Sequence, residues 1–225
     1  MVMKLTEADR EKVSAAITAA EAKSSGEIVA VATPISDAYH DVALHWALVP
    51  LFAVLAWAAF RPTALVWWYN FLFGGWNPDP TLGELLTLLM VFAALKFTIA
   101  LLILKWMPLR LLLTPGATKH RRVRRRAVAI FQAAAAGRTA GKTGILIYLS
   151  MAERRAEIIA DEAIHKVADD HIWGEAMHAL IVETREGRAG HGIVAAIERV
   201  GVVLAKHFPR SADDINEIPD KLIEL

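Results

Sequence analysis

Hydrophobic residues follow two different patterns along this chain. Ala43 to Phe60 and Leu85 to Leu104 are almost continuously apolar, whereas the segments before and after them mix polar and apolar positions. Crossing a bilayer takes about 20 apolar residues, and only a helix or a closed barrel satisfies every backbone polar group there. The pattern therefore predicts a hairpin of two transmembrane helices inserted into a water-soluble domain.

Aromatic residues gather around the same region. The connector from Arg61 to Asp79 is rich in them, and tryptophan prefers the interface between lipid and water. We expect this connector to lie on or dip into the interface and not to form a folded domain. Six of the seven tryptophans would form an aromatic belt: Trp46, Trp57, Trp67, Trp68, Trp76 and Trp106.

The soluble segments show the periodicities of short strands and amphipathic helices. A helix starts at Thr6, a strand (EIVAVAT) follows, and after the apolar region a helix starts at Thr118. GILIYLS and RAEIIAD are close enough to pair as an antiparallel hairpin. Three closing helices are predicted at 163–168, 173–183 and 193–207.

Strand, crossover helix and strand in this order predict a parallel pair with a right-handed connection. The hairpin adds an antiparallel strand, so the fold class is α/β, with a small mixed sheet sandwiched by helices and interrupted by the transmembrane hairpin. The expected organisation is 1–40 and 108–209 for the two parts of the domain, 41–107 for the hairpin and connector, and 210–225 for a flexible tail.

Charge and composition limit the possible partners, chemistry and location of the protein. The 25 basic and 24 acidic residues nearly balance, which argues against a nucleic-acid-coating surface, and the absence of cysteine excludes disulfides and thiolate sites. The connector carries only Arg61, whereas basic residues crowd the segment after the second apolar stretch, so the positive-inside rule places both termini in the cytoplasm. We expect a multi-pass protein of the inner (cytoplasmic) membrane.

Two basic features are candidate interaction sites. The arginine run beyond the second apolar stretch favours contact with anionic lipid over nucleic acid, because it follows a membrane helix and lacks an aromatic platform. Lys96 lies near the middle of the second apolar stretch, where a charge is costly, so it either snorkels toward the interface or meets a buried partner or a second copy. The arginines are Arg121, Arg122, Arg124, Arg125 and Arg126.

Glu27 and Asp161 are the candidate metal ligands. Asp161 ends the antiparallel strand and should lie near Ser24 and Glu27, at the start of the first strand. Two carboxylates with Ser24 could bind calcium or magnesium, which prefer oxygen ligands. The alternative is that Asp161 caps the following helix and Glu27 pairs with a surface cation. No Asp-x-Asp motif or Cys-x5-Arg loop supports phosphoryl transfer, so no catalytic residue is assigned.

Three sequence blocks resemble a known family. They are EAKSSGEIVAVA, then RTAGKTGILIYLSMAERRAEIIAD, and finally a tryptophan-containing helix followed by GIVAAIERVGVVLAKHFP. The chain is similar here to the TPM domain family, named after a thylakoid lumenal phosphatase, a photosystem II repair protein and an acetylcholine-receptor accessory protein. The resemblance covers about residues 4–33 and 119–209.

The resemblance implies an α/β/α sandwich and membrane association. Plant members of the family are described as acid phosphatases, divalent-ion binding is reported, and other members are accessory proteins of membrane complexes. This chain departs from the pattern through its internal hairpin and cytoplasmic charges. The expected function is an accessory or scaffold module for a membrane complex, with another membrane protein or a second copy as partner. A divalent-metal-dependent phosphatase and an anionic-lipid-surface regulator are the alternatives.

Overall fold

The computed structural model describes residues 5–74, 79–134, 142–211, 213 and 216–225. The chain divides into two compact units, one of Met1–Asp37 with Gly116–Leu225 and one of Ala38–Pro115. The first unit contains α1 (Glu7–Glu21), β1 (Glu27–Thr33), α6 (Gly116–Ala134), β2 (Gly144–Ser150), β3 (Arg155–Ala160), α7 (Glu162–His165), α8 (Asp170–Arg185), α9 (Ala189–His207) and β4 (Ile223–Glu224). The second contains α2 (His40–Phe60), α3 (Pro62–Phe73), α4 (Leu82–Ile103) and α5 (Met107–Leu113).

The sheet of the first unit has the order β3-β2-β1-β4. β1 and β2 run parallel, from Glu27 opposite Gly144 to Thr33 opposite Ser150, and β3 pairs antiparallel with β2. The predicted mixed sheet, with a crossover between its parallel strands and an antiparallel hairpin, is therefore confirmed.

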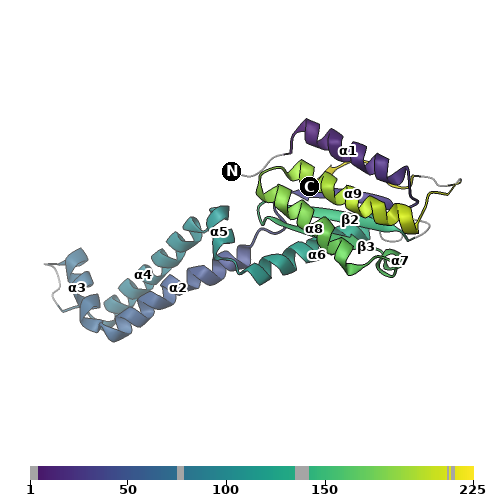
Figure 1. The fold of residues 1–225 in the computed structure, drawn as a ribbon. Helices are drawn as coiled ribbons and strands as arrows, with labels where there is room; N and C mark the ends of the chain where they lie inside the picture. Colours follow the sequence, from purple (N-terminus) through teal and green to yellow (C-terminus); the bar gives the residue numbers. More distant parts are fainter. Residues whose placement is uncertain (1–4, 75–78, 135–141, 212, 214–215) are drawn as a thin grey trace. The chain divides into compact units, whose positions relative to one another are not determined.

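Helices cover both faces of this sheet (Figure 1). Alternate residues of β1 point to opposite faces, so Ile28 packs toward α1, α8 and α9, while Val29 packs toward α6. Every residue of β1 and β2 is buried, as expected for parallel strands covered on both sides. The fold is thus an α/β/α sandwich.

Local sequence explains the helices of this sandwich. A capping box between Thr6 and Asp9 starts α1, which buries Val13 and Ile17 at helical spacing. α8 and α9 cross closely at Gly192, where a β-carbon would lie 2.7 Å from the carbonyl oxygen of Leu180. A larger residue at 192 would push the two helices apart.

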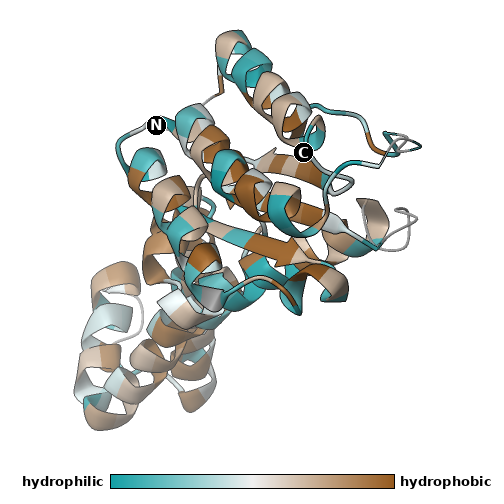
Figure 2. Cartoon of the chain, turned by 45° about the vertical axis from the view of Figure 1, so that its right-hand side comes forward, coloured by the Kyte–Doolittle hydropathy of each residue, from teal (hydrophilic) through white to brown (hydrophobic). Residues whose placement is uncertain are grey.

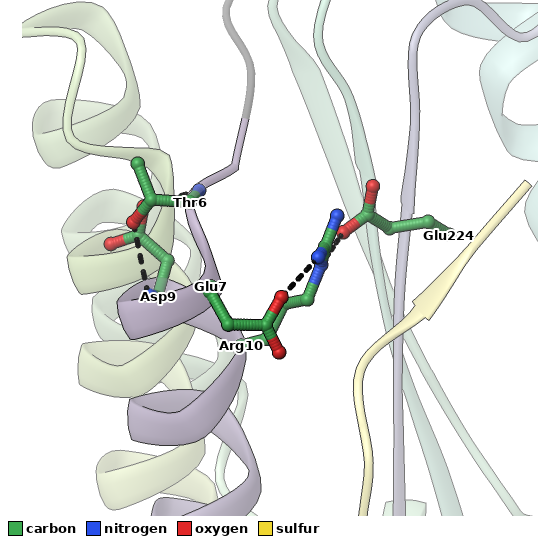
Figure 3. A network of polar contacts seen from close by, with 5 residues as sticks. All are labelled: Thr6, Glu7, Asp9, Arg10 and Glu224. Carbon is green, nitrogen blue, oxygen red and sulfur yellow. Dashed lines mark hydrogen bonds and ion pairs between the residues drawn. The ribbon is translucent and has the colours of Figure 1, made fainter.

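The C-terminal segment differs from the flexible tail that the sequence predicts. β4 pairs parallel with β1, with Ile223 opposite Val31. Arg10 of α1 bridges Glu7 of its own helix and Glu224 of β4, at 2.5 and 2.6 Å (Figure 3). Ile218 is buried on the α6 face of the sheet. The segment is mostly polar, but its few apolar side chains fit an open strand edge, which a composition-based reading cannot detect.

The second unit consists of apolar helices with little buried surface. α2 and α4 pack on each other and are both long and apolar enough to cross a membrane. Hydrophobic colours prevail along the helices of this unit (Figure 2). The sequence predicts that the hairpin segment runs from 41 to 107, whereas the second compact unit runs from 38 to 115. The helix α5 therefore belongs to the hairpin unit.

The connector between the two apolar stretches contains a helix that the sequence analysis did not predict. α3 buries Leu65 and Tyr69 against Leu88 of α4, and Tyr69 donates a hydrogen bond of 2.9 Å to Glu84. Trp67 stacks on Phe71 with ring centroids 5.5 Å apart. Trp76, part of the proposed aromatic belt, lies outside the described residues.

Candidate functional site: a carboxylate cavity at the amino end of the sheet

A cavity of about 150 Å³ lies where α1 ends, β1 begins and the C-terminal segment passes. Three of its lining side chains are carboxylic acids, contributed by segments at opposite ends of the chain. The lining residues are Thr18, Glu21, Ala22, Glu27, Arg210, Asn216 and Asp220.

Glu21 enters the cavity from the last residue of α1. It follows Ile17 by four positions and therefore continues the buried face of the helix. Its Oε1 accepts a hydrogen bond of 2.7 Å from the backbone N–H of Ile28, while its Oε2 is buried without a hydrogen-bond partner. The side chain is only 9% exposed, so this free oxygen faces the cavity and not bulk water.

Glu27 enters from the first residue of β1 and is 5% exposed. Its Oε1 accepts a hydrogen bond of 3.2 Å from the backbone N–H of Glu217, which ties the C-terminal segment to the strand. Its Oε2 is also buried without a partner. The two Oε2 atoms thus accept no hydrogen bond from the described chain, although a protonated Glu21 can donate to the nearby Asp220.

Asp220 closes the cavity from the C-terminal segment. Thr18 donates a hydrogen bond of 2.7 Å to Oδ2, and the side-chain amide of Asn216 donates to Oδ1. Burial acts to raise the pKa of Asp220, but these hydrogen bonds outweigh it and hold the pKa below its ordinary value. Asp220 is therefore the ionised member of the group.

The pKa values of the two glutamates are raised, whereas that of Asp220 is lowered. Burial raises the pKa of Glu21 to about 9, and the nearby Glu27 and Asp220 raise it further against the opposing N–H of Ile28. Burial also raises the pKa of Glu27, opposed by the N–H groups of Glu217 and Ile218. At neutral pH Glu21 holds a proton beside an ionised Asp220. The cavity can exchange this proton, or accept a donor or a positive charge, at its free oxygens.

The residues predicted to share a metal ion make different contacts in the structure. Ser24 is buried, and its hydroxyl makes long hydrogen bonds to Ala20 and Gly26. Asp161 holds the N-cap position of α7, but its Oδ2 accepts a hydrogen bond of 2.9 Å from the N–H of Gly144, with no side-chain cap bond. Gly144 is the strand partner of Glu27, so both acids lie at the same end of the sheet.

Only Glu27 of the predicted ligands lines the cavity. Within the described residues, no group of three histidine, aspartate or glutamate side chains could hold a metal ion. Calcium or magnesium binding by Glu27, Asp161 and Ser24 stays a prediction.

Sequence reasoning missed Glu21 and Asp220. A signal for Glu21 was present, because an acidic residue on the buried stripe of an amphipathic helix needs a specific environment. Asp220 had no comparable signal, since it lies in a polar segment that reaches the cavity through tertiary contacts, among them the pairing of β4 with β1.

The predicted basic residues occupy different surroundings. Arg122 pairs with Asp37 at 3.0 Å and Arg124 with Glu157 at 3.4 Å, both within the first unit. Lys96 is exposed on α4 of the hairpin unit. The remaining arginines of the run are exposed on α6 and form no ion pair with the described residues: Arg121, Arg125 and Arg126.

The fold and this cavity define a small α/β/α domain protein with an apolar helix pair inserted after its first strand. Residues 109–203 match the model of the TPM domain, so this part of the chain is similar to that domain family.

A solved structure supports the fold. The BA42 protein of the psychrophilic bacterium Bizionia argentinensis, determined by NMR, aligns with a TM-score of 0.55 and 19% sequence identity. The alignment covers 98% of this chain and 95% of that one. None of the curated proteins matches the chain.

Proposed function

We propose that this protein is a membrane-anchored accessory module, in which a TPM domain is held at the inner membrane to support a membrane protein complex. The observation that carries the proposal is the pair α2 and α4, which are long and apolar enough to span a bilayer and mostly exposed in their own unit. A soluble protein that exposed this apolar surface would aggregate. Lipid covers it in the proposed setting.

The distribution of charge supports cytoplasmic termini. The connector has only one basic residue, whereas the segment after α4 carries a cluster. The exposed Lys96 on α4 supports a contact with an acidic group of a membrane partner or of a second copy, because a lysine facing lipid at mid-membrane is costly.

Membrane integration and topology can be tested in one preparation, since the chain has no cysteine. Asp79 in the connector and Ser211 in the soluble unit are exposed, so each is replaced singly by cysteine. We expect the protein to resist alkaline carbonate extraction, and an impermeant maleimide to label Asp79→Cys but not Ser211→Cys in intact cells. Recovery in the soluble fraction would refute the anchoring.

The accessory role has its own test. The detergent-solubilised complex is sized for the wild type and for Lys96→Met, with Lys105→Met, outside the α4 helix, as the matched control. We expect the wild type and the control to migrate as a larger assembly than the 24.7 kDa chain, and Lys96→Met to shift toward the monomer. Monomeric migration of all three proteins would count against the role.

A divalent-metal-dependent phosphatase is the second candidate. The two unsatisfied oxygens of Glu21 and Glu27 favour it, because carboxylates are the ligands that calcium and magnesium prefer. Thermal unfolding is followed while either ion is added to the wild type, Glu27→Gln and Asp161→Asn. A rise in melting temperature lost in both variants would support the predicted site and justify a phosphatase screen. No rise would remove this candidate.

A further inference from the structure

The arginines of α6 divide into two groups by their contacts. Arg122 and Arg124 form ion pairs with Asp37 and Glu157, and His120 also lies 3.3 Å from Glu157. These pairs fasten the two flanks of α6 to the rest of its unit. Arg121, Arg125 and Arg126 are exposed, with no ion pair within the described chain, and Arg121 and Arg125 are one turn apart.

Two of the unpaired arginines also share one side of the helix. Val123, Ala127 and Phe131 are buried and define the inner face of α6. With 3.6 residues per turn, Arg121 and Arg125 lie one turn apart on the side of α6 away from these residues. Arg122 and Arg124 differ from them through their ion pairs with Asp37 and Glu157. We call Arg121 and Arg125 the outward pair, and Arg122 and Arg124 the flanking pair.

We propose that the outward pair docks on the phosphate groups of anionic phospholipids. The inference rests on the membrane anchoring proposed above. Only residues 104–115 separate the end of α4 from the start of α6, and α5 occupies part of that link. A helix tethered so closely to a membrane span experiences the negative potential of an anionic leaflet. Guanidinium groups bind phosphate oxygens with two parallel hydrogen bonds, which suits arginine better than lysine.

The flanking pair makes a matched control. Both pairs lie on one helix and both double replacements with glutamine remove two positive charges. General attraction to an anionic surface would be weakened equally by either replacement. Docking through the outer face requires the outward pair and tolerates loss of the flanking pair.

The test uses the full chain in vesicles. Ala129 is exposed on α6 one turn beyond Arg125, and Ala129→Cys gives a single attachment point for an environment-sensitive dye. The labelled protein is incorporated into vesicles of phosphatidylcholine alone or with 30% phosphatidylglycerol. Flotation with neutral vesicles tests the anchoring separately from the dye response.

We expect a blue shift in the anionic vesicles only. Arg121→Gln with Arg125→Gln should lower the ratio of docked to undocked protein roughly 30-fold, since each basic residue near an anionic surface contributes about fivefold. Arg122→Gln with Arg124→Gln should keep the shift and lower the melting temperature, because the Arg122–Asp37 and Arg124–Glu157 ion pairs are lost. Half-molar salt should abolish the shift through screening.

Three outcomes would overturn the docking proposal. One is a protein that floats but shows no shift with anionic lipid, and another is an equal loss of the shift in both double variants. The third is binding of a short DNA duplex at physiological salt through the outward pair, without any response to vesicles. Failure to float would instead refute the membrane anchoring and remove the basis for both proposals.

Discussion

The two ends of the sheet treat buried carboxyl groups differently. Glu153, in the turn between β2 and β3, is 8% exposed, and Glu21 is 9% exposed. Both oxygens of Glu153 accept hydrogen bonds. Oε1 accepts one of 2.9 Å from the N–H of Ser36, and Oε2 accepts one from the hydroxyl of Ser150. Glu21 leaves one oxygen unsatisfied. Two equally buried glutamates therefore play different roles. Glu153 links chain segments through hydrogen bonds, which we call the brace, whereas Glu21 keeps an oxygen that can still accept a hydrogen bond.

The brace at the carboxyl end joins the segment after β1 to the β2–β3 hairpin. Ser36 also shares a hydrogen bond of 2.9 Å with the hydroxyl of the fully buried Tyr148. The N–H of Met151 donates to the carbonyl of Thr33 at 3.0 Å. At the amino end the C-terminal segment lies over the carboxyl groups: the N–H of Glu217 donates to Glu27, and Asn216 and Asp220 line the cavity.

The largest expected effect comes from breaking the brace. Glu153→Ala removes the acceptor of the partly buried Ser36 N–H and of the buried Ser150 hydroxyl, so we expect a loss of about 3 kcal/mol in the free energy of unfolding. Glu153→Gln keeps the shape and one acceptor and should cost less. Urea unfolding of the full chain in detergent measures both. A cost below about 1 kcal/mol for Glu153→Ala would mean that the two ends do not differ as proposed.

At the amino end, stability should depend on pH through Glu21. Its pKa is about 9 in the folded protein against an ordinary value of 4.5, so the folded state keeps a proton that the unfolded chain releases. The stabilisation is complete below pH 4.5 and is lost as the pH rises toward 9. We expect the free energy of unfolding to fall by roughly 2 kcal/mol between pH 6 and pH 9, after allowance for partial access of water.

Glu21→Gln is the control for this titration. The amide oxygen still accepts from Ile28 and the side chain no longer ionises, so the pH dependence should flatten and the variant should be the more stable protein at pH 9. Chemical denaturation at several pH values gives the comparison. An unchanged slope in Glu21→Gln would assign the titration to another group.

Glu21 and Glu27 should be energetically coupled. Both are charged only above the pKa of Glu21, about 9, where their like charges repel in the shared cavity. A double-mutant cycle with glutamine should therefore give about 0.5–1 kcal/mol of interaction at pH 10. Glu27→Gln alone should have the smaller effect, because the N–H groups of Glu217 and Ile218 already stabilise its charged form. Strict additivity would indicate that the two carboxyl groups do not share one cavity.

The sequence predicts the strands of the sheet well, but it does not predict the different roles of Glu153 and Glu21 at the two ends of the sheet. EIVAVAT and GILIYLS are buried along their whole length, and such local runs are readable without tertiary information. The cavity needs Glu21 and Asp220 brought together from the two ends of the chain, and the brace needs Ser36 beside Glu153. α3 and β4 were missed for the same reason, since packing against α4 and β1 selects them over their weak local patterns.

The smallest effect is expected for Asp161→Asn, because Asp161 does not line the cavity. Its Oδ2 accepts from the N–H of Gly144, and an asparagine can keep that bond through its remaining side-chain oxygen. Asp161→Asn should therefore change the free energy of unfolding by less than about 0.5 kcal/mol in the absence of divalent ions. With calcium or magnesium present, the same variant reports on the predicted site. If wild type and Asp161→Asn gain equal stability from the ion, then Asp161 is a backbone acceptor alone, and any ion site at this end belongs to the cavity of Glu21 and Glu27.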